Sequence, residues 1–572
     1  MLTKLAVRNF KNFEEIVVEL GEAVVLIGPN NSGKTSALQA LSLWELGLRK
    51  WNEKKGGKEA TAKRPGVVIN RRDLFAVAVL DSNHLWKDLH VRDVTRVGGA
   101  AKSTRNIRIE IIVEGVSKGK SWSCGLEFDF ANRETFHCRP LRVADEKDPQ
   151  RMPVPAEADE VRVAFLPPMS GLVDREFMKL PGELGFLIGQ GRTAEVLRNL
   201  CWQAFQAKQW AGLTEKMKRF FGIQLQIPDY IPERSEIQVQ YKDPSGVMLD
   251  ISSSGRGVQQ TLLLLAYLAM NPGSVLLLDE PDAHLEILRQ RQIYRVLTET
   301  AREQGSQIVA ASHSEVVLNE AAGRDIVVAF VGKPHRIDNR GSQVLKSLKD
   351  IGFEEYYQAE HRGWVLYLEG STDLFILQSL ARKLGHPAVE ALDAPFVHYI
   401  ENQPNRAVSH FSGLQEAKLD LRGLVLCDRL EREFPPAPDT LTMRMWKRRE
   451  IENYVCSFAS LLAYARRSAE RRSLGPLFAE DLVRTDEQIM RECVQLLVPP
   501  VAIDDAHDRW WINTKASTDF LDRLFELYYE RLALPNLMRK TNYHILAEYV
   551  ERDEIDEEVP SVLDEVFRVS QG

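Results

Sequence analysis

The amino-acid sequence predicts an α/β protein made of two parts, each built around a parallel sheet. Three largely apolar runs, at residues 23–27, 274–278 and 307–311, are typical of central strands that are buried on both faces. A glycine turn and then apolar residues at helical spacing follow the first run, so the chain alternates strand, turn and helix. A second strand–helix cycle begins at residues 364–368 and leads to another apolar strand at residues 424–427.

The predicted domain boundary lies near residue 355, just before the second cycle begins. We expect the first domain to span residues 1–355, with inserted strands and helices at about residues 50–250. The second domain is expected to span residues 356–572 and to have a largely helical C-terminal part. The helical pattern at residues 193–221 is too short for a long coiled coil, which excludes a rod-bearing protein.

Composition narrows the classes of function before any motif is considered. The chain has 572 residues and a formal net charge of −7, so any contact with nucleic acid must come from a local basic patch. Its cysteines are scattered without metal-binding spacing, as in a reduced cytosolic protein. No stretch is apolar for long enough to span a membrane, and the first residues contain no apolar signal core. We therefore expect a cytoplasmic protein with no membrane partner.

A phosphate-binding loop follows the first buried strand. Residues 28–35 are GPNNSGKT and fit the P-loop pattern G-x-x-x-x-G-K-[ST]. Lys34 is expected to neutralise the β- and γ-phosphates of ATP, and the Thr35 hydroxyl to bind Mg²⁺. A glycine loop that only caps a helix is the alternative, but the strand before it and the helix after it argue for phosphate. The candidate nucleotide-binding residues are Gly28, Pro29, Asn30, Asn31, Ser32, Gly33, Lys34, Thr35 and Ser36.

Two acids follow the second buried strand. Asp279 at the end of the strand could hold Mg²⁺ through water, and Glu280 could orient or deprotonate an attacking water. Two solvated acids at a strand end are common in isolation. Their combination with the P-loop predicts a site for ATP hydrolysis.

Two further motifs belong to the same part of the chain. Residues 252–257 are SSSGRG and precede a long apolar helix, and amides at a helix N-terminus recognise phosphate. Ser254 and Gly255 are therefore candidate nucleotide contacts. His313 follows the third strand, where an imidazole could contact the γ-phosphate. A lone histidine at a strand end is more often structural, and its place after the other motifs favours a catalytic role.

In this order, GPNNSGKT, SSSGRG, LLLDEPDAHL and SHS resemble the ABC ATPase superfamily over about residues 1–335. The short, rodless insertion is similar to the ATPase heads of the OLD (overcoming lysogenization defect) family. The resemblance implies ATP and Mg²⁺ between the heads of a homodimer or higher homo-oligomer. The signature departs from LSGGQ at three positions, which leaves the hydrolysis rate open. By this resemblance the Walker B aspartate is Asp279, the catalytic base Glu280, the switch histidine His313 and the signature Ser254 and Gly255.

In the second domain, each of two apolar strands is followed by an acid. Glu369 follows residues 364–368, and Asp428 follows residues 424–427. Parallel strands that deliver acids to one edge of a sheet make a candidate site for Mg²⁺, which prefers carboxylates and water. Each acid alone suits a helix cap or a solvated turn. Asp373, at the start of the next helix, is a further candidate metal ligand, although by itself it suits an N-cap.

This spacing resembles the TOPRIM fold of topoisomerases, primases and OLD-family nucleases over about residues 362–572. The resemblance implies a site for Mg²⁺ or Mn²⁺ built from a strand-end glutamate and a D-x-D motif. Arginine and leucine follow Asp428, so the second aspartate is missing and Glu431 is the nearest substitute. OLD-type versions add a helix-borne glutamate, matched by Glu452, and a lysine, for which Lys515 is the candidate.

Basic residues cluster in the sequence close to this proposed metal site. Lysine and arginine with an interleaved aromatic suit a nucleic acid, although a solvated helix face is an equally good interpretation. Residues 466–472 contain four more arginines, and the acidic stretch at 551–558 is expected to be solvated surface. The cluster consists of Arg444, Trp446, Lys447, Arg448 and Arg449.

Two functions fit these observations. In the first, ATP-driven engagement of the heads controls a metal-dependent nuclease acting on DNA or RNA, and the resemblance implies a role in prokaryotic anti-phage defence. In the second, the ATPase is a sensor or assembly platform, and the second domain binds nucleic acid or a partner protein without cutting. The missing aspartate favours the second hypothesis, whereas Glu452, Lys515 and the basic cluster favour the first, which we prefer. A protein trigger or effector is compatible with both.

Overall fold

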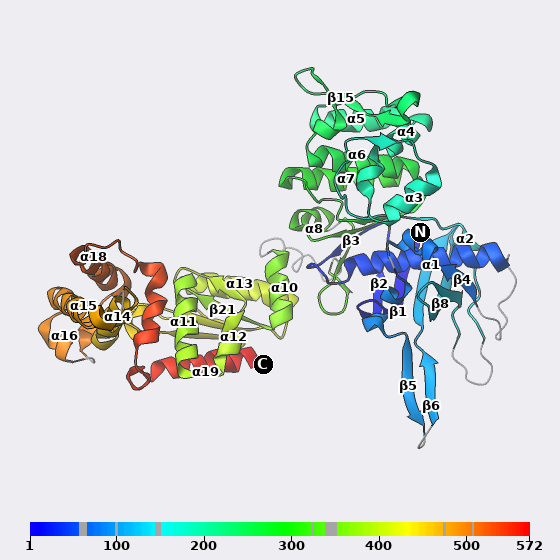
Figure 1. Ribbon diagram of the computed structural model, residues 1–572. Coiled ribbons are helices and arrows are strands. Elements are labelled where there is room, and N and C mark those ends of the chain that lie inside the picture. Colours follow the sequence, from blue (N-terminus) through cyan, green and yellow to red (C-terminus); the bar gives the residue numbers. More distant parts are fainter. Residues whose placement is uncertain are drawn as a thin grey trace. The chain divides into compact units, whose positions relative to one another are not determined.

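The computed structural model describes residues 1–55, 66–79, 81–97, 101–143, 150–322, 324–337, 352–472, 476–505 and 508–571. The chain forms two compact units, Met1–Leu345 and Lys346–Gly572 (Figure 1). Residue 355, the expected boundary, lies within helix α10 (Phe353–Arg362) of the second unit. In the parts of the chain that the structure describes, no helix combines the length and the apolar character needed to cross a membrane.

A six-stranded sheet of the first unit carries the nucleotide motifs. Its neighbouring strands run parallel except at the β19–β20 edge. Asp279 lies opposite Ala311, and Ser312 lies opposite Ile27, so three motif-bearing strands end level with one another. All three predicted apolar strands are therefore confirmed. In spatial order the strands are β10 (Val163–Leu166), β17 (Val275–Asp279), β18 (Gln307–Ser312), β3 (Ala23–Ile27), β19 (Ile326–Ala329) and β20 (His335–Arg336).

Helices cover both faces of this sheet. Side chains alternate between the two faces along each strand, so Leu277 and Val309 pack on the side of helix α1 (Lys34–Lys55). Leu276 and Ile308 pack against the helices on the other face. Figure 1 shows those helices gathered at the top of the first unit, with α1 below them. They are α4 (Leu197–Gln206), α5 (Trp210–Phe221), α6 (Arg256–Met270) and α7 (Ile287–Glu303).

The insertion contributes four of the six strands of a second sheet and contains the predicted helical pattern. Antiparallel strands cover the outer side of α1, whose residues share a core with them. The helical pattern at residues 193–221 forms α4 and α5 rather than one helix, because the chain turns at Lys208, whose φ is 61°. The antiparallel strands are, in spatial order, β2 (Phe13–Glu19), β1 (Leu2–Phe10), β7 (Ile109–Ser117), β8 (Lys120–Asn132), β9 (Thr135–Pro140) and β4 (Val67–Asn70).

Short elements complete the described part of the first unit. The helices are α2 (Ala156–Asp159), α3 (Pro181–Gly189) and α8 (Glu315–Ala321). The strands are β5 (Arg92–Val97), β6 (Ala101–Asn106), β11 (Glu176–Phe177), β12 (Gln224–Leu225), β13 (Asp229–Ile231), β14 (Glu236–Gln238), β15 (Gln240–Lys242) and β16 (Met248–Asp250).

The second unit is built on a four-stranded parallel sheet, which contains the two predicted apolar strands side by side. The strand order is β22 (Val397–Tyr399), β21 (Trp364–Leu368), β23 (Arg422–Cys427) and β24 (Leu441–Met445). One face packs against α10 and α13 (Pro404–Ala417). The opposite face packs against α11 (Ser371–Leu384), α12 (Ala388–Asp393) and α19 (Glu558–Gln571).

The rest of the second unit is largely helical, which confirms that expectation. Its described elements are α14 (Phe458–Arg472), α15 (Pro476–Leu497), α16 (Pro500–Asp504), α17 (Arg509–Asn513), a π-helix (Ala516–Leu521), α18 (Asp522–Arg531) and a 3₁₀ segment (Lys540–Tyr549). The acidic stretch at 551–558 was expected to be solvated, and this is wrong for Glu558. Asp556 binds Arg448 at 2.9 Å, and Glu558 is buried and accepts a hydrogen bond from Tyr454.

Candidate nucleotide site and carboxylate cluster

The P-loop joins β3 to α1 in a conformation that its glycines permit. Asn31 and Gly33 have φ values of 63° and 103°, in the left-handed region that favours glycine and asparagine. A Cβ added to Gly33 would lie 2.5 Å from the ring of Phe13. At Gly28 an added Cβ would lie 2.8 Å from the carbonyl oxygen of Phe330. Both glycines are therefore required by close approach of the chain.

Lys34 and Ser32 give this loop the chemistry of a phosphate site. The Lys34 Nζ donates hydrogen bonds of 2.7 Å to the carbonyl oxygens of Gly28 and Pro29. Burial lowers the pKa of Lys34, and the charges of Asp279 and Glu280 act in the opposite direction. The Ser32 Oγ is buried without a hydrogen-bond partner among the described residues. A phosphate group would supply the missing acceptor, so the donor set fits ATP.

Asp279 and Thr35 form the part of the site that could hold Mg²⁺. The Thr35 Oγ1 donates to both carboxylate oxygens of Asp279, at 3.1 and 2.9 Å. Burial raises the pKa of Asp279 to about 6, and Glu280 adds to this, while Thr35 and Lys34 oppose it. A cation beside the carboxylate would favour its charged form, so the pair fits a magnesium ion.

Glu280 and His313 face one another across the ends of adjacent strands. Glu280 adopts a left-handed φ of 50°, and its N–H donates to the carbonyl of Ala311 at 2.9 Å. The His313 Nδ1 lies 3.7 Å from the Glu280 Oε1, and both side chains are at least one-third exposed. His313 follows β18, which lies between β17, the strand that ends at Asp279, and β3, the strand before the P-loop. The two predicted catalytic residues are thus brought together.

Sequence reasoning missed two charged residues near these groups. Lys11 lies in the turn between β1 and β2, donates a hydrogen bond to Gln39, and its charge acts on Asp279. Asp282 is 3% exposed, shares a side-chain hydrogen bond with Ser312, and its Oδ1 has no partner among the described residues. The DEPD sequence could have identified Asp282. No sequence motif marks Lys11, because only the folded chain places it near Asp279.

The signature turn lies at the N-terminus of α6 and is open to solvent. Gly255 is the N-cap residue of α6, and the space around its Cα is open, since an added Cβ would meet nothing within 4 Å. Ser254 donates to the carbonyl of Ile251 at 2.7 Å, which fixes the turn locally. This exposed helix N-terminus is available to phosphate presented by another molecule.

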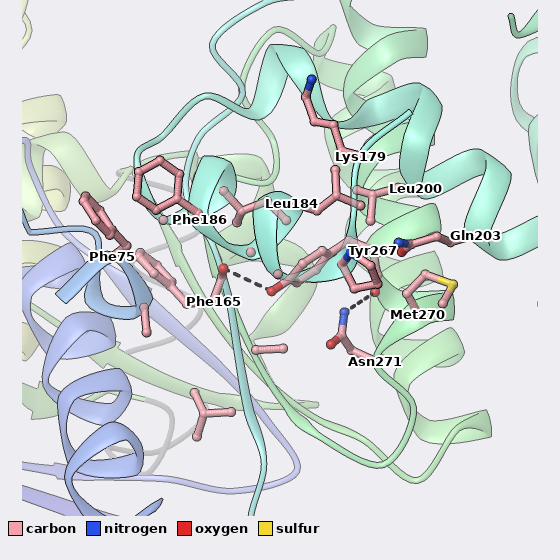
Figure 2. Close-up of a pocket in the computed structure, with 18 of the residues that line it drawn as sticks. Phe75, Phe165, Lys179, Leu184, Phe186, Leu200, Gln203, Tyr267, Met270 and Asn271 are labelled. Carbon is pink, nitrogen blue, oxygen red and sulfur yellow. Dashed lines mark hydrogen bonds between the residues drawn. The ribbon is translucent and has the colours of Figure 1, made fainter. Parts of the chain in front are cut away.

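A cavity of about 1070 Å³ in the first unit is separate from the P-loop. Figure 2 shows its apolar side chains, including Phe75, Phe165 and Leu184, from three segments of the unit. Tyr267 donates to the carbonyl of Phe165 at 3.1 Å, and Asn271 donates to the carbonyl of Tyr267 at 2.8 Å. None of the predicted nucleotide-binding residues lines this cavity.

In the second unit, four predicted acids form what we call the carboxylate cluster: Glu369, Asp373, Asp428 and Glu452. Glu369 and Asp428 follow the neighbouring strands β21 and β23, and they share a side-chain hydrogen bond. Such a bond requires a proton on one of the two groups. Burial raises the pKa of Asp428 strongly, and the charges of Glu369 and Asp373 add to the rise.

Asn402 links these two acids and was not predicted. Its Nδ2 donates to Glu369 and, at 3.1 Å, to the Asp428 Oδ2, while its Oδ1 accepts from the Asp428 N–H at 3.0 Å. Asn402 follows the edge strand β22, and its φ of 54° is left-handed, as is that of Glu401. Asparagine tolerates this conformation better than most residues.

Asp373 belongs to the cluster and is not an N-cap. Helix α11 begins at Ser371 and has Gly370 as its N-cap, so Asp373 lies inside the first turn. The expectation that Asp373 is the N-cap is therefore wrong. Its Oδ2 accepts from the N–H of Glu369 at 3.1 Å, and the side chain is buried. Burial raises the pKa of Asp373 to about 6, and the charge of Glu369 adds to this.

Glu452 lies on a short 3₁₀ helix, Ile451–Tyr454, rather than on an α-helix. Its side chain is 3% exposed, and burial raises its pKa to about 8, with contributions from Glu450 and Asp373. The charge of Lys540 acts in the opposite direction. Glu450, which was not predicted, forms a capping box with Asn453 at this turn.

Lys515 and Glu431 are both exposed, in contrast to the buried acids. Lys515 immediately precedes the π-helix, and its loop is fixed to the Glu452 turn. Asn453 donates to the Thr514 carbonyl at 2.9 Å, and Glu450 accepts from the Ser517 N–H. Lys515 can therefore reach outward from a fixed position. Glu431 lies in the exposed loop beyond Asp428, where the structure provides it with no comparable anchor among the described residues.

Several side chains of the basic cluster are buried or form ion pairs within the second unit. Trp446 is 2% exposed, so its ring cannot stack on a nucleobase without unfolding. Arg444 binds Glu565 at 3.0 Å, and Arg448 binds Asp556 and lies over the ring of Tyr454. Lys447 is exposed, and Arg449 is half-buried. The prediction of an aromatic nucleic-acid contact at Trp446 is therefore wrong.

Comparisons with known proteins support an ATPase assignment. A family described as "AAA ATPase domain" matches residues 1–64, and one described as "AAA domain, putative AbiEii toxin, Type IV TA system" matches residues 203–319. An OLD nuclease of Thermus scotoductus (strain ATCC 700910 / SA-01) is 24% identical over 335 residues, which cover 55% of this chain and 59% of that protein. The matched region thus spans little more than half of the relative's length.

Two solved SMC heads are among the similar structures. The SMC head domain of Thermotoga maritima is 13% identical, with a TM-score of 0.31 and coverage of 59% of this chain and 98% of that chain. An SMC head of Pyrococcus furiosus with an extended coiled coil is 11% identical, with a TM-score of 0.35 and coverage of 61% and 99%. The P-loop geometry, the Thr35–Asp279 pair and the two family matches identify the first unit as an ATPase domain, and over about half of its length the chain is similar to an OLD nuclease.

Proposed function

We propose that this chain is an ATP-controlled nuclease. ATP and Mg²⁺ bind at the P-loop, and a divalent metal at the carboxylate cluster supports cleavage of a phosphodiester in DNA or RNA. The observation that carries the nuclease site is the pair Glu369 and Asp428, held together by Asn402 at the ends of two parallel strands. The two strand-end acids are similar to those of a TOPRIM metal site. In this chain the Asn402 amide accompanies them.

The charges of the cluster favour a bound cation. Glu369, Asp373, Asp428 and Glu452 repel one another in a largely buried site, and burial and like charges raise the pKa of Asp428 and of Glu452. Mg²⁺ or Mn²⁺ would replace the protons and supply charge for the leaving oxygen. Mg²⁺ keeps several waters, so few protein ligands suffice and the missing D-x-D aspartate is tolerable. Lys515 would then neutralise charge on the scissile phosphate.

ATP hydrolysis would take place between two copies of the chain. The open signature turn, with Ser254 and Gly255 at the N-terminus of α6, suits a phosphate bound by the P-loop of a second copy. Glu280 would activate the attacking water, and His313 would contact the γ-phosphate. The chain would thus act as a homodimer or a higher homo-oligomer. We place it in prokaryotic anti-phage defence, where a nucleic-acid or protein trigger would start cleavage.

A second function remains supported by particular residues. The D-x-D motif is incomplete, Glu431 is exposed, and Trp446 and Arg448 serve the interior of the unit rather than an open nucleic-acid surface. In that case the second unit would bind nucleic acid or a partner protein without cutting, and the ATPase would act as a sensor.

A cleavage assay distinguishes the two functions. Full-length protein is incubated with DNA and with tRNA-like RNA, in Mg²⁺ or Mn²⁺, with and without ATP. Wild-type protein should cut one of them, Asp428→Asn should not, and ATP hydrolysis should persist in that variant. Glu433→Gln, an exposed acid in the same loop, is the matched control and should cut normally. Equal cleavage by Asp428→Asn, or no cleavage under any trigger tested, would leave the binding function standing.

A further inference from the structure

A group of two histidines and one glutamate lies on the other side of the sheet that carries the carboxylate cluster. Glu355 of α10, His398 of β22 and His410 of α13 each place a ligand atom within 4.8 Å of the other two. The His398 Nδ1 lies 2.9 Å from Glu355 Oε1, and the His410 Nε2 lies 2.8 Å from Glu355 Oε2. The two imidazole rings are stacked, with centroids 3.8 Å apart. Three separate elements therefore converge on one point.

This convergence needs a physical reason, because two stacked imidazoles contact the two oxygens of one carboxylate. If both were protonated, their positive charges would lie face to face at van der Waals distance. A single divalent cation between them would remove that conflict, since it binds both neutral imidazoles and the carboxylate.

The residue behind His410 supports the same role. Tyr367 of β21 is fully buried, and its hydroxyl lies 2.9 Å from the His410 Nδ1. A phenol can accept as well as donate, so it can accept a hydrogen bond from Nδ1–H, which leaves the lone pair of Nε2 free to bind a metal. Histidine ligands of metals are usually oriented by such a partner on their second nitrogen.

We propose that Glu355, His398 and His410 bind one divalent transition-metal ion, with Zn²⁺ as the best fit. Two imidazole nitrogens and one carboxylate oxygen are the ligand set typical of zinc with an open fourth position, whereas Mg²⁺ prefers oxygen ligands alone. His398 and Glu355 are each about 30% exposed, which gives the ion a route from solvent and a place for water as the fourth ligand. His410 is 10% exposed and forms the inner side of the site.

The ion would brace the part of the sheet that positions the carboxylate cluster. Tyr367 lies two residues before Glu369 on β21, and His398 lies four residues before Asn402. The strand ends are joined by a 2.9 Å hydrogen bond from the Ile400 N–H to the Leu368 carbonyl. Zinc would therefore hold α10, α13 and β22 against β21 without touching the four acids. This role is separate from cleavage and does not depend on it.

The test is a Zn²⁺ titration of the EDTA-treated, desalted full-length protein by calorimetry, together with X-ray absorption of the zinc-loaded protein. We expect a site of one ion per chain whose zinc shell contains two histidine nitrogens. His398→Gln and His410→Gln should each lose this site, and Tyr367→Phe should weaken it about 10- to 100-fold. Zinc should also raise the melting temperature of the wild type and not that of His398→Gln or His410→Gln.

Three controls keep the result decisive. His386, just after the C-terminus of α11, contacts Asp564 and is not part of the proposed site. The His386→Gln variant should therefore bind zinc like the wild type. Asp428→Asn should also keep the site, because the carboxylate cluster is not involved. Glu355→Gln keeps an uncharged hydrogen-bonding side chain and should still lose tight binding. A zinc shell without histidine nitrogen, or wild-type affinity in the folded His398→Gln and His410→Gln variants, would overturn the proposal.

Discussion

The nucleotide site and the carboxylate cluster both lie at the carboxyl ends of parallel strands, but their charges are balanced differently. Around Asp279, the chain supplies Lys34 and Lys11, and the pKa of this aspartate is raised by burial only to about 6. In the carboxylate cluster, burial raises the pKa of Glu452 to about 8, and burial and Glu369 raise that of Asp428 further. The acids of the carboxylate cluster therefore keep protons, whereas the negative charge of Asp279 is balanced by lysine side chains.

This difference indicates what each site needs in order to work. In the first site, lysines and backbone N–H groups offer positive charge to a phosphate, and Mg²⁺ would enter together with ATP. In the second site, the carboxylates need a metal before any substrate arrives, because removal of their protons otherwise leaves like charges in contact. The following changes test this contrast, from the largest expected effect to the smallest.

Removal of the P-loop amine should have the largest effect. Lys34→Ala removes the charge that faces the phosphates, so measurable ATP binding should disappear while the fold is kept. Calorimetry with ATP checks this. Lys50→Ala, on the same helix but paired with Asp73 at 2.9 Å, is the matched control and should bind normally. Wild-type affinity in Lys34→Ala would show that the P-loop is not the nucleotide site.

Removal of the proposed catalytic base should be nearly as severe for turnover. Glu280→Gln keeps the size of the side chain but cannot accept a proton, so ATP hydrolysis should slow by about 10²- to 10⁴-fold. ATP should still bind, and light scattering should show an accumulated dimer unless the chain is already dimeric. Turnover is therefore the stricter measurement. Glu299→Gln, on the exposed side of α7, should hydrolyse ATP normally; equal rates in both variants would contradict the role of Glu280.

Asn402 should affect the second site only. Asn402→Ala removes the link between Glu369 and Asp428, and Mn²⁺ affinity in the absence of nucleotide should fall about 10- to 100-fold. Asn402→Asp supplies an extra carboxylate and should bind Mn²⁺ more tightly than Asn402→Ala. The control is Asn405→Ala, an exposed residue on α13. If Asn402→Ala binds Mn²⁺ as the wild type does, the amide does not organise this site.

The smallest effect is on stability and pH. Glu452 has a pKa of about 8 in the folded chain because it is buried, against an ordinary value of about 4 in the unfolded chain. The folded state therefore binds an extra proton between these values, and the contribution of Glu452 to the free energy of unfolding falls as pH rises through that window. In the absence of divalent metal, the free energy of unfolding of the wild type should decrease between about pH 5 and 8. In Glu452→Gln this decrease should be smaller by roughly 1 kcal/mol or more.

Urea unfolding in EDTA at several pH values measures this contribution. Mn²⁺ should restore more stability to the wild type near the alkaline end than near the acid end, because the metal replaces the proton. Glu548→Gln, an exposed acid, should leave the pH dependence unchanged. A pH dependence that is identical in Glu452→Gln and wild type would contradict the assignment of a raised pKa to this group.

The same contrast explains how much could be predicted from the sequence. The P-loop is contiguous, and buried parallel strands are largely apolar, so strands β3, β17, β18, β21 and β23 and the residues at their ends were predictable. Asn402 carries no motif, since its role depends on the placement of β22 beside β21. Lys11 reaches the nucleotide site only through folding of the antiparallel strands.

Charge and aromatic patterns were less informative than strand patterns. Trp446 and Glu558 lie in polar stretches that suggest solvent, yet both are buried. Glu558 is stabilised by Tyr454 and by the N–H of Lys447, partners more than a hundred residues away in sequence. A local window cannot contain such pairs, so a charge run alone does not separate a nucleic-acid surface from an internal ion-pair network.

Mn²⁺ binding to the full-length chain is the most direct test of the contrast between the two sites. Without nucleotide, we predict a Mn²⁺ site that is lost in Asp428→Asn and kept in Asp279→Asn. ATP should then add a second site, which is lost in both Lys34→Ala and Asp279→Asn. A nucleotide-independent Mn²⁺ site that survives Asp428→Asn and disappears in Asp279→Asn would contradict the account.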